Sequence, residues 1–268
     1  MESNKWKMKN GDASESLCER LKSRSPLFAA LVLAYAVMWL GGVGHYVIVG
    51  GPPLNAPWAA SLFLFLAGAV VMWTSAQRDW LGLGLAATLG FAAEMHGVKY
   101  GVIFGPYHYT EVLQPRVWGV PLAMFSAWLV LVAYTRQMLM PLRLADWLKT
   151  VLASAWMTAL DLVIDPLAAH QLGYWRWEGT GAYYGIPARN FIGWFVVSWL
   201  IFTLVRQRWR ANPWARYVGL SITLFFTVIA LSYGLWLAGG VGLALCLLHY
   251  AVASGVTKKL PVHISGID

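Results

Sequence analysis

Charged residues are scarce in this chain, and their scarcity argues against an ordinary water-soluble domain. Only 12% of the 268 residues are Asp, Glu, Lys or Arg, whereas soluble domains usually carry about 25%. Hydrophobic residues make up 59%, and the mean hydropathy is +0.56. A surface with so few charges suits contact with lipid rather than water, so the composition predicts an integral membrane protein.

Cysteine is equally rare, and several common enzyme motifs are missing. The two cysteines are Cys18, in a polar N-terminal segment, and Cys246, in an apolar one, so we expect neither a disulfide nor a thiol metal site. The sequence contains no Walker loop, no Gly-x-Gly-x-x-Gly between a strand and a helix, no Gly-x-Ser-x-Gly and no Cys-x-x-Cys. These absences argue against a nucleotide-driven or disulfide enzyme, and no cofactor is expected.

Long apolar segments are present, and they predict an all-α bundle of seven or eight transmembrane helices. A helix needs about 20 residues to cross the hydrocarbon core. The predicted spans are 27–48, 57–74, 80–100, 117–137, 147–168, 188–205, 217–236 and 240–256. The last two could be short helices hinged at Gly239 and Gly240, or one span followed by an interfacial piece.

The distribution of Lys and Arg favours eight spans and a cytoplasmic N-terminus in the cell membrane. With eight spans, 16 of these residues lie inside and 4 outside, whereas seven spans give 14 and 6. The basic segment 1–26 is expected to be a flexible cytoplasmic anchor beside anionic lipid rather than a nucleic-acid binder or a cleaved signal peptide. After this segment we expect one membrane domain, 27–256, and a short C-terminal tail, 257–268.

Two Gly-rich and aromatic loops, 101–116 and 169–187, are expected at the outer face. Each leads to a Gly-x-Pro, ending at Pro121 or Pro187, and each proline is followed seven residues later by a tryptophan. Acidic residues precede each loop. Spans 3–4 and 5–6 therefore look like two parallel copies of one unit, in which an acidic helix, an aromatic loop and a Trp-bearing helix follow one another.

Glu94, Asp161 and Asp165 are the candidate catalytic residues. An ionisable group within a span costs roughly 2.5–3.5 kcal/mol on insertion scales, so it usually faces the bundle interior and has a function. Asp161 and Asp165 share one helix face, about 6 Å apart along the axis, and Pro166 is expected to end the span at Asp165.

Two carboxylates this close in a poorly solvated site resist double ionisation. One of them is therefore expected to keep its proton and to be usable as a general acid. The alternative for Asp161 and Asp165 is a structural role, either in salt bridges to Lys99, Arg176 or Arg189 or in hydrogen bonds between helices. For Glu94 the alternative is a polar contact that helps helices to pack.

Aromatic residues near the outer face are the candidate substrate-binding residues. Their ring faces could line a pocket that stabilises a transient cation, although Trp and Tyr also form structural belts at membrane interfaces. Asn190 could position a water molecule, or it could cap a helix. The substrate-binding set is Tyr107, Tyr109, Trp175, Trp177, Tyr183, Tyr184, Asn190 and Trp194.

Histidines give no clear metal motif. His96 lies two residues from Glu94 and so nearly opposite it around the helix. A site built from His96, His108 and His170 is conceivable, but none of their spacings is typical of metal ligands, so no metal is expected.

Several of these motifs together resemble the CruF-type carotenoid biosynthesis family. They are the runs 161–166 (DLVIDP), 173–177 (GYWRW), 183–187 (YYGIP) and 190–194 (NFIGW), with Glu94, 104–107 (FGPY), Tyr109 and 119–121 (GVP) upstream. The resemblance spans roughly residues 30–255 and is specific within 90–195. It carries over no established catalytic residue, so the site assignment rests on the residues themselves.

The resemblance implies a multi-spanning protein similar to carotenoid 1,2-hydratases, including bisanhydrobacterioruberin hydratase and γ-carotene hydratase. Such proteins add water to the terminal double bond of an acyclic or monocyclic carotenoid. The expected partners are a carotenoid from the bilayer, membrane lipids and other enzymes of the pathway, and nucleic acid is not among them.

The predicted chemistry is cofactor-free hydration. Asp165 or Asp161 would protonate the alkene, the other carboxylate would stabilise the tertiary cation, and Glu94 or Asn190 would orient the water. Three other functions remain open. They are a carotenoid end-group cyclase, a Mg²⁺-dependent membrane prenyltransferase using the two aspartates, and a proton-coupled transporter of a lipophilic solute.

Overall fold

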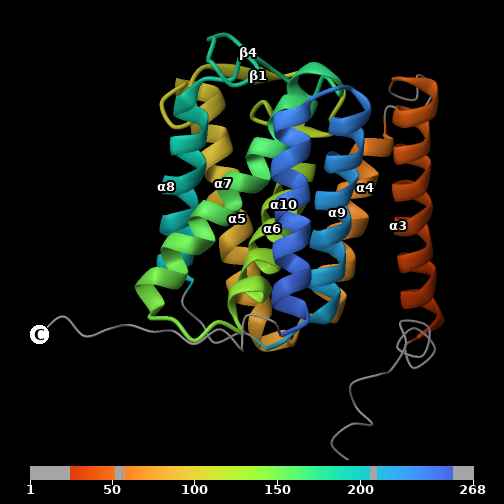
Figure 1. The fold of residues 1–268 in the computed structure, drawn as a ribbon, viewed down its shortest axis with the longest axis vertical. Coiled ribbons are helices and arrows are strands. Elements are labelled where there is room, and N and C mark those ends of the chain that lie inside the picture. The colour runs from red at the N-terminus through yellow and green to blue at the C-terminus, as the bar shows by residue number, and fades with distance from the viewer. Residues whose placement is uncertain (1–24, 52–55, 57, 206–209, 256–268) are drawn as a thin grey trace, which may run out of the picture.

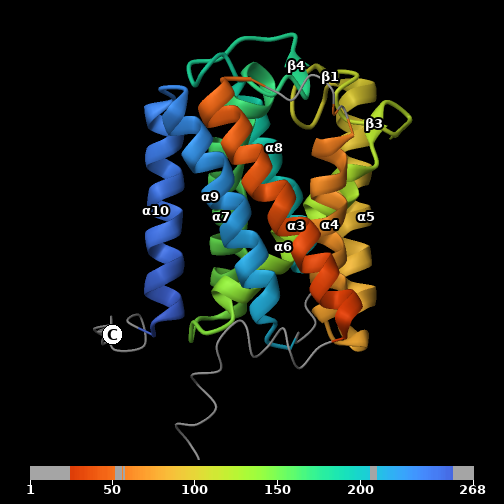
Figure 2. The ribbon, with the colours of Figure 1, turned by 90° about the vertical axis from the view of Figure 1, so that its right-hand side faces the viewer.

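A computed structural model shows that the chain folds into a bundle of helices that run roughly along its long axis (Figure 1). The structure describes residues 25–51, 56, 58–205 and 210–255. The predicted N-terminal tail, except for its last two residues, and the segment 257–268 lie outside the described residues, as does Cys18. The first described helix begins and the last one ends at the same end of the bundle (Figures 1 and 2).

Eight α-helices make up the described part of the chain, in agreement with the eight-span alternative. They are α3 (Pro26–Gly44), α4 (Ala59–Thr74), α5 (Gln77–Tyr100), α6 (Ala123–Leu139), α7 (Asp146–His170), α8 (Ala188–Leu204), α9 (Pro213–Ser232) and α10 (Trp236–Ala253), and a π-helical turn, η2 (His45–Val49), extends α3. Five are long and apolar enough to cross a membrane, namely α3 with η2, α5, α7, α9 and α10. The predicted all-α membrane bundle is confirmed.

Two short antiparallel sheets lie at the end of the bundle away from the described termini. Strand β1 (Tyr107–Tyr109) pairs with β4 (Trp175–Trp177), so that His108 faces Arg176 at the centre. Strand β2 (Arg116–Val117) pairs with β3 (Val120–Pro121) in a hairpin. The β1–β4 pair joins the two predicted units, since β1 lies between α5 and α6 and β4 lies between α7 and α8 (Figure 1).

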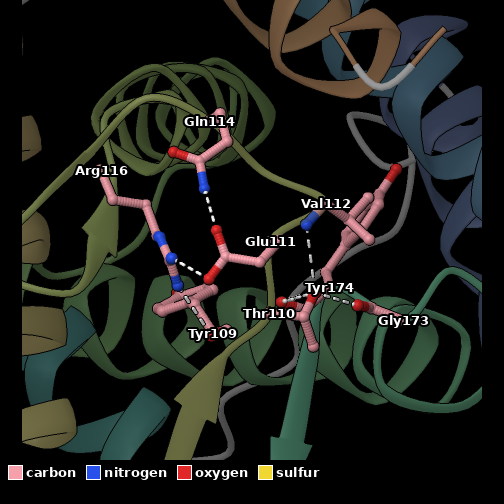
Figure 3. Close-up of polar contacts among 8 residues, drawn as sticks. All are labelled: Tyr109, Thr110, Glu111, Val112, Gln114, Arg116, Gly173 and Tyr174. Carbon is pink, nitrogen blue, oxygen red and sulfur yellow. Dashed lines mark hydrogen bonds and ion pairs between the residues drawn. The ribbon is translucent and has the colours of Figure 1, made fainter.

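The loop after β1 is tied both to itself and to the loop before β4. The backbone N–H of Thr110 donates to the carbonyl of Tyr174 at 3.0 Å. Arg116 donates to the Glu111 carboxylate and, at 3.0 Å, to the carbonyl of Tyr109 (Figure 3). These contacts hold Tyr109 and its strand in place over the bundle.

Two predicted helix boundaries were wrong. Helix α6 begins at Ala123 rather than 117, because the β2–β3 hairpin occupies 116–121 and turns at Trp118 and Gly119, whose φ angles are +50° and +83°. Helix α7 does not end at Asp165 but continues to His170, with Pro166 inside it. The helix continues because the carbonyl that the proline leaves without a helical donor receives a hydrogen bond from Tyr183.

The hinge between the last two helices is also displaced from its predicted position. The chain turns at Gly234, whose φ is +72°, while Gly239 and Gly240 lie inside α10. A Cβ on Gly239 would come within 2.4 Å of the Leu231 side chain. Gly239 therefore serves close packing of α9 against α10 rather than a break.

Candidate functional site

A cavity of about 80 Å³ lies inside the bundle at the β1–β4 end. It is lined by residues of α4 to α9 and of the two aromatic loops. The wall near the β1–β4 sheet holds the ionisable and polar residues, namely Glu94, Asp161, Asp165, Asn190, Tyr107, Tyr109, Trp175 and Trp177. The rest of the wall is made by aliphatic and aromatic residues, namely Leu64, Phe104, Met124, Ala127, Trp128, Leu131, Ile164, Tyr174, Trp194, Ile222 and Phe226.

Glu94 projects into this cavity from α5 and is 5% exposed. Its Oε2 accepts hydrogen bonds from the hydroxyls of Tyr107 and, at 3.0 Å, of Tyr109. Its Oε1 accepts one from Trp128 Nε1 on α6 at 3.2 Å. Trp128 can reach this position because Gly90, one turn before Glu94, has no side chain, and a Cβ there would lie 2.2 Å from the indole ring.

Asp165 has a corresponding arrangement in the second unit. Its Oδ1 accepts hydrogen bonds from Trp175 Nε1 at 2.6 Å and from Trp177 Nε1 at 3.1 Å, both on β4. Its Oδ2 accepts one from Asn190 Nδ2 at 2.8 Å. Each unit thus places one carboxyl group among three donors, two from its own aromatic strand and one from its following helix.

Asp161 lies one turn before Asp165 and is 1% exposed. Its Oδ2 accepts a hydrogen bond from Asn190 Nδ2 at 2.6 Å. Asn190, near the start of α8, therefore uses its amide nitrogen to bridge the two aspartates. In the described part of the chain this is the one hydrogen bond to the Asp161 carboxyl group, whereas Asp165 and Glu94 each receive three.

None of the three acids belongs to an ion pair among the described residues. The ion pairs of that part include Arg78–Asp79, His108–Glu178 and Arg116–Glu111. The alternative of salt bridges to Lys99, Arg176 or Arg189 is therefore wrong. Hydrogen bonding between helices is present, because Asn190 on α8 bonds to both aspartates on α7. The described residues contain no group of three His, Cys, Asp or Glu placed to hold a metal ion.

The tyrosines and tryptophans of β1 and β4 direct their polar atoms toward the acids. Burial, followed by the charge of Glu94, raises the pKa of both Tyr107 and Tyr109 well above the usual value, so both hydroxyls keep their protons and can donate. The ring of Tyr107 contacts that of Trp177 across the two strands at a centroid distance of 4.9 Å. The aromatic residues of β1 and β4 are thus hydrogen-bonding parts of the site.

The structure brings most of the predicted site residues together. Asp161, Asp165, Glu94, Tyr107, Tyr109, Trp175, Trp177, Asn190 and Trp194 all line the cavity. It does not bring Tyr183 and Tyr184 to the cavity wall. Tyr183 bonds to the backbone of α7, and the Tyr184 hydroxyl accepts from the N–H of Leu237 at 3.0 Å.

His96, as expected, does not share the site. It is exposed on α5 and contacts the ring of Tyr100 at a centroid distance of 4.7 Å. Trp128 belongs to the site but was not among the predicted site residues, although its spacing from Pro121 matched that of Trp194 from Pro187. The sequence could not indicate which apolar residues form the cavity wall, because apolar residues occur on every span.

This geometry combines acids with a water-poor, aromatic surrounding. Charges and dipoles act strongly where water is excluded, so a carboxyl group here can protonate a weak base and a carboxylate can stabilise a nearby cation. The apolar wall suits a hydrocarbon ligand better than a polar one.

A comparison with protein families gives one match, to a family described as carotenoid biosynthesis protein, over residues 58–249. The matched segment includes every residue that lines the cavity. No curated protein and no solved structure matches the chain. The match covers more than two thirds of the sequence and agrees with the resemblance seen in its motifs, and the chain belongs to the carotenoid biosynthesis protein family.

Proposed function

We propose that this protein is a cofactor-independent hydratase that adds water to the terminal 1,2 double bond of an acyclic or monocyclic carotenoid. The observation that carries the proposal is the pair Asp161 and Asp165, joined by the amide of Asn190 at the wall of a largely apolar and aromatic cavity. Hydration of an alkene needs a proton donor, an anionic environment for a cation, and water. The family membership supports a carotenoid as the substrate.

Asp161 is the proton donor in this proposal. Glu94 and Asp165 each accept three hydrogen bonds, and each bond stabilises the carboxylate form over the protonated one. Asp161 receives a single hydrogen bond, at Oδ2, so its other oxygen can carry a proton. That proton passes to the less substituted carbon of the terminal double bond, and the positive charge is left on the tertiary carbon.

Asp165 is the counter-ion for this cation. An indole N–H can only donate, so Trp175 and Trp177 together require Asp165 Oδ1 to act as an acceptor. The amide N–H of Asn190 likewise requires Asp165 Oδ2 to act as an acceptor. A fixed carboxylate, with aromatic rings beside it, lowers the energy of a carbocation without becoming protonated.

Glu94 orients the attacking water. It accepts hydrogen bonds from three donors and lies on the wall contributed by the first unit. Water forms the new C–O bond at the tertiary carbon, and the proton that the oxonium oxygen loses restores the carboxylic acid of Asp161. The cycle therefore consumes one alkene and one water and leaves a tertiary alcohol, with no oxidant or reductant.

The cavity takes the end of the substrate rather than all of it. A volume of about 80 Å³ holds several water molecules or a short branched hydrocarbon end, but not a long polyene. The apolar residues of α4, α6 and α9, such as Leu64, Leu131 and Phe226, suit the carbon chain as it leaves toward the lipid. The substrate would enter from the bilayer.

The proposed orientation puts this site at the non-cytoplasmic side of the cell membrane. The described end of the bundle opposite the site carries Arg136, Arg143, Lys149, Arg210 and Arg216, as the positive-inside rule expects of the cytoplasmic side. A cysteine introduced at the exposed Trp118 should react with a membrane-impermeant thiol reagent in intact cells. Labelling only after permeabilisation would contradict this orientation.

The test is expression in cells that make lycopene, followed by pigment analysis. The expected product is lycopene plus one water, and its hydroxyl oxygen should come from isotope-labelled water. In deuterium oxide, one deuterium should appear on the carbon next to the carbinol carbon. A product isomeric with lycopene would indicate an end-group cyclase, in which an internal alkene captures the same cation, and unchanged pigment with this and with monocyclic substrates would contradict the proposal.

A further inference from the structure

Helix α7 contains a defect close to the two aspartates. Pro166 lies inside the helix, which runs from Asp146 to His170. A proline has no N–H, so the carbonyl four residues earlier, that of Leu162, lacks its regular helical donor. Inside a transmembrane bundle little water is present to donate to such a carbonyl, so a neighbouring side chain must supply the hydrogen bond.

The hydroxyl of Tyr183 supplies the missing donor. Tyr183 Oη donates to the carbonyl oxygen of Leu162 at 2.8 Å, across 21 residues of sequence. Burial raises the pKa of Tyr183 above its usual value, so the hydroxyl stays protonated and able to donate. Leu162 directly follows Asp161, so the bond is made within the turn that separates Asp161 from Asp165.

The ring of Tyr183 also reaches helix α8, which carries the hydrogen-bond partner of both aspartates. It packs edge-to-face against Phe191 at a centroid distance of 5.5 Å, and Phe191 directly follows Asn190 on α8. The N–H of Ile186 donates to the carbonyl of Tyr183 at 2.9 Å, which closes the tight turn holding this ring. Tyr183 therefore touches the helix of the aspartates with its hydroxyl and the helix of Asn190 with its ring.

We infer that Tyr183 is a positioning residue, whose hydroxyl replaces the donor missing at Pro166 and holds the turn of α7 that presents Asp161 and Asp165 to Asn190. Tyr183 does not line the cavity, so it acts through these residues and not on the substrate. The inference rests on the proposed function for its effect on catalysis, but not for its effect on α7.

The experiment is a double-mutant cycle between Tyr183→Phe and Pro166→Ala. In the natural sequence, Tyr183→Phe should lower kcat about tenfold while KM stays unchanged, because the donor acid moves and the apolar wall does not. Pro166→Ala returns an N–H to the helix, and in that background Tyr183→Phe should change kcat less than about twofold. Equal losses in both backgrounds, or no loss in the natural one, would overturn the inference.

Tyr184→Phe is the matched control, since it also removes a tyrosine hydroxyl with one backbone partner, here Leu237 at the start of α10. It should leave kcat within about twofold of the natural enzyme. A fall in kcat as large as that of Tyr183→Phe would show a general effect of the loop and overturn the inference.

Hydrogen–deuterium exchange of the α7 peptide around 162–170, with the purified protein in detergent, separates this inference from the proposed function. Exchange should accelerate in Tyr183→Phe, stay unchanged in Tyr184→Phe, and return to normal in Tyr183→Phe with Pro166→Ala. These results would support the positioning role even if the protein hydrates no carotenoid. Unchanged exchange in Tyr183→Phe would contradict it whatever the activity.

Discussion

Trp128 and Trp194 stack inside the bundle, with ring centroids 4.5 Å apart and an angle of 12° between their planes. Each follows the proline of its own Gly-x-Pro by seven residues, Pro121 in the first unit and Pro187 in the second. Equivalent tryptophans of the two units thus stack on each other, and strands β1 and β4, one from each unit, pair edge to edge. The cavity is built where the two units meet.

The two tryptophans are equivalent in position but not in bonding. Trp128 Nε1 donates to Glu94, whereas the hydrogen bonds among described residues include none from Trp194. Trp128→Phe should therefore lower activity about tenfold more than Trp194→Phe, since a hydrogen bond to a charged group contributes roughly 1.5–3 kcal/mol. Steady-state rates of the two purified variants check this, and equal losses would mean that stacking alone matters.

Asp161→Asn should remove activity by about a thousandfold, because the amide cannot donate the required proton to the alkene. Asp165→Asn should cost about a hundredfold, because the cation loses its counter-ion while the donor remains. Glu178→Gln, at an exposed residue of the same loop region, should leave the rate unchanged. The carotenoid profile of cells expressing each variant gives the comparison, and full activity in either aspartate variant would remove that residue from the mechanism.

Gly90→Ala should destabilise the protein by about 1–3 kcal/mol, because its Cβ would lie 2.2 Å from the indole ring of Trp128 and force that ring away from Glu94. Activity should fall together with stability. Gly84→Ala is the control on the same helix, since a Cβ there meets nothing within 4 Å. It should be neutral or stabilise α5 by up to about 1 kcal/mol. Thermal unfolding in detergent measures both, and equal melting temperatures would contradict the packing argument.

Ala127→Phe should fill the apolar wall of the cavity and raise KM about tenfold or more, while the hydrogen bonds of the carboxyl groups stay intact. Ala92→Phe places the same ring on the exposed face of α5 and should have little effect. Michaelis–Menten analysis with solubilised carotenoid distinguishes the two. A fall in kcat with unchanged KM would show that Ala127 borders the reacting atoms rather than the hydrocarbon chain.

The sequence predicted the membrane bundle because the hydrophobic length of each span is a local property. The sequence also identified the acids at 94, 161 and 165, because an acidic residue within an apolar segment stands out without knowledge of the fold. The sequence also indicated the two-unit organisation, through the repeated spacing of Gly-x-Pro and tryptophan. It misplaced the end of α7, because Pro166 usually stops a helix and only a distant hydroxyl lets this one continue.

Other features were decided only by the tertiary structure. Tyr183 and Trp175 look alike in sequence as aromatic residues of one loop, yet Tyr183 bonds to a backbone carbonyl and Trp175 to a catalytic candidate. The assignment of Asp161 as the acid depends on how many donors reach each carboxyl group, and those donors come from four different elements. Composition and spacing thus determined which residues are available, while the packing of helices from the two units decided which of them meet, because hydrogen-bond partners distant in sequence are set by the fold.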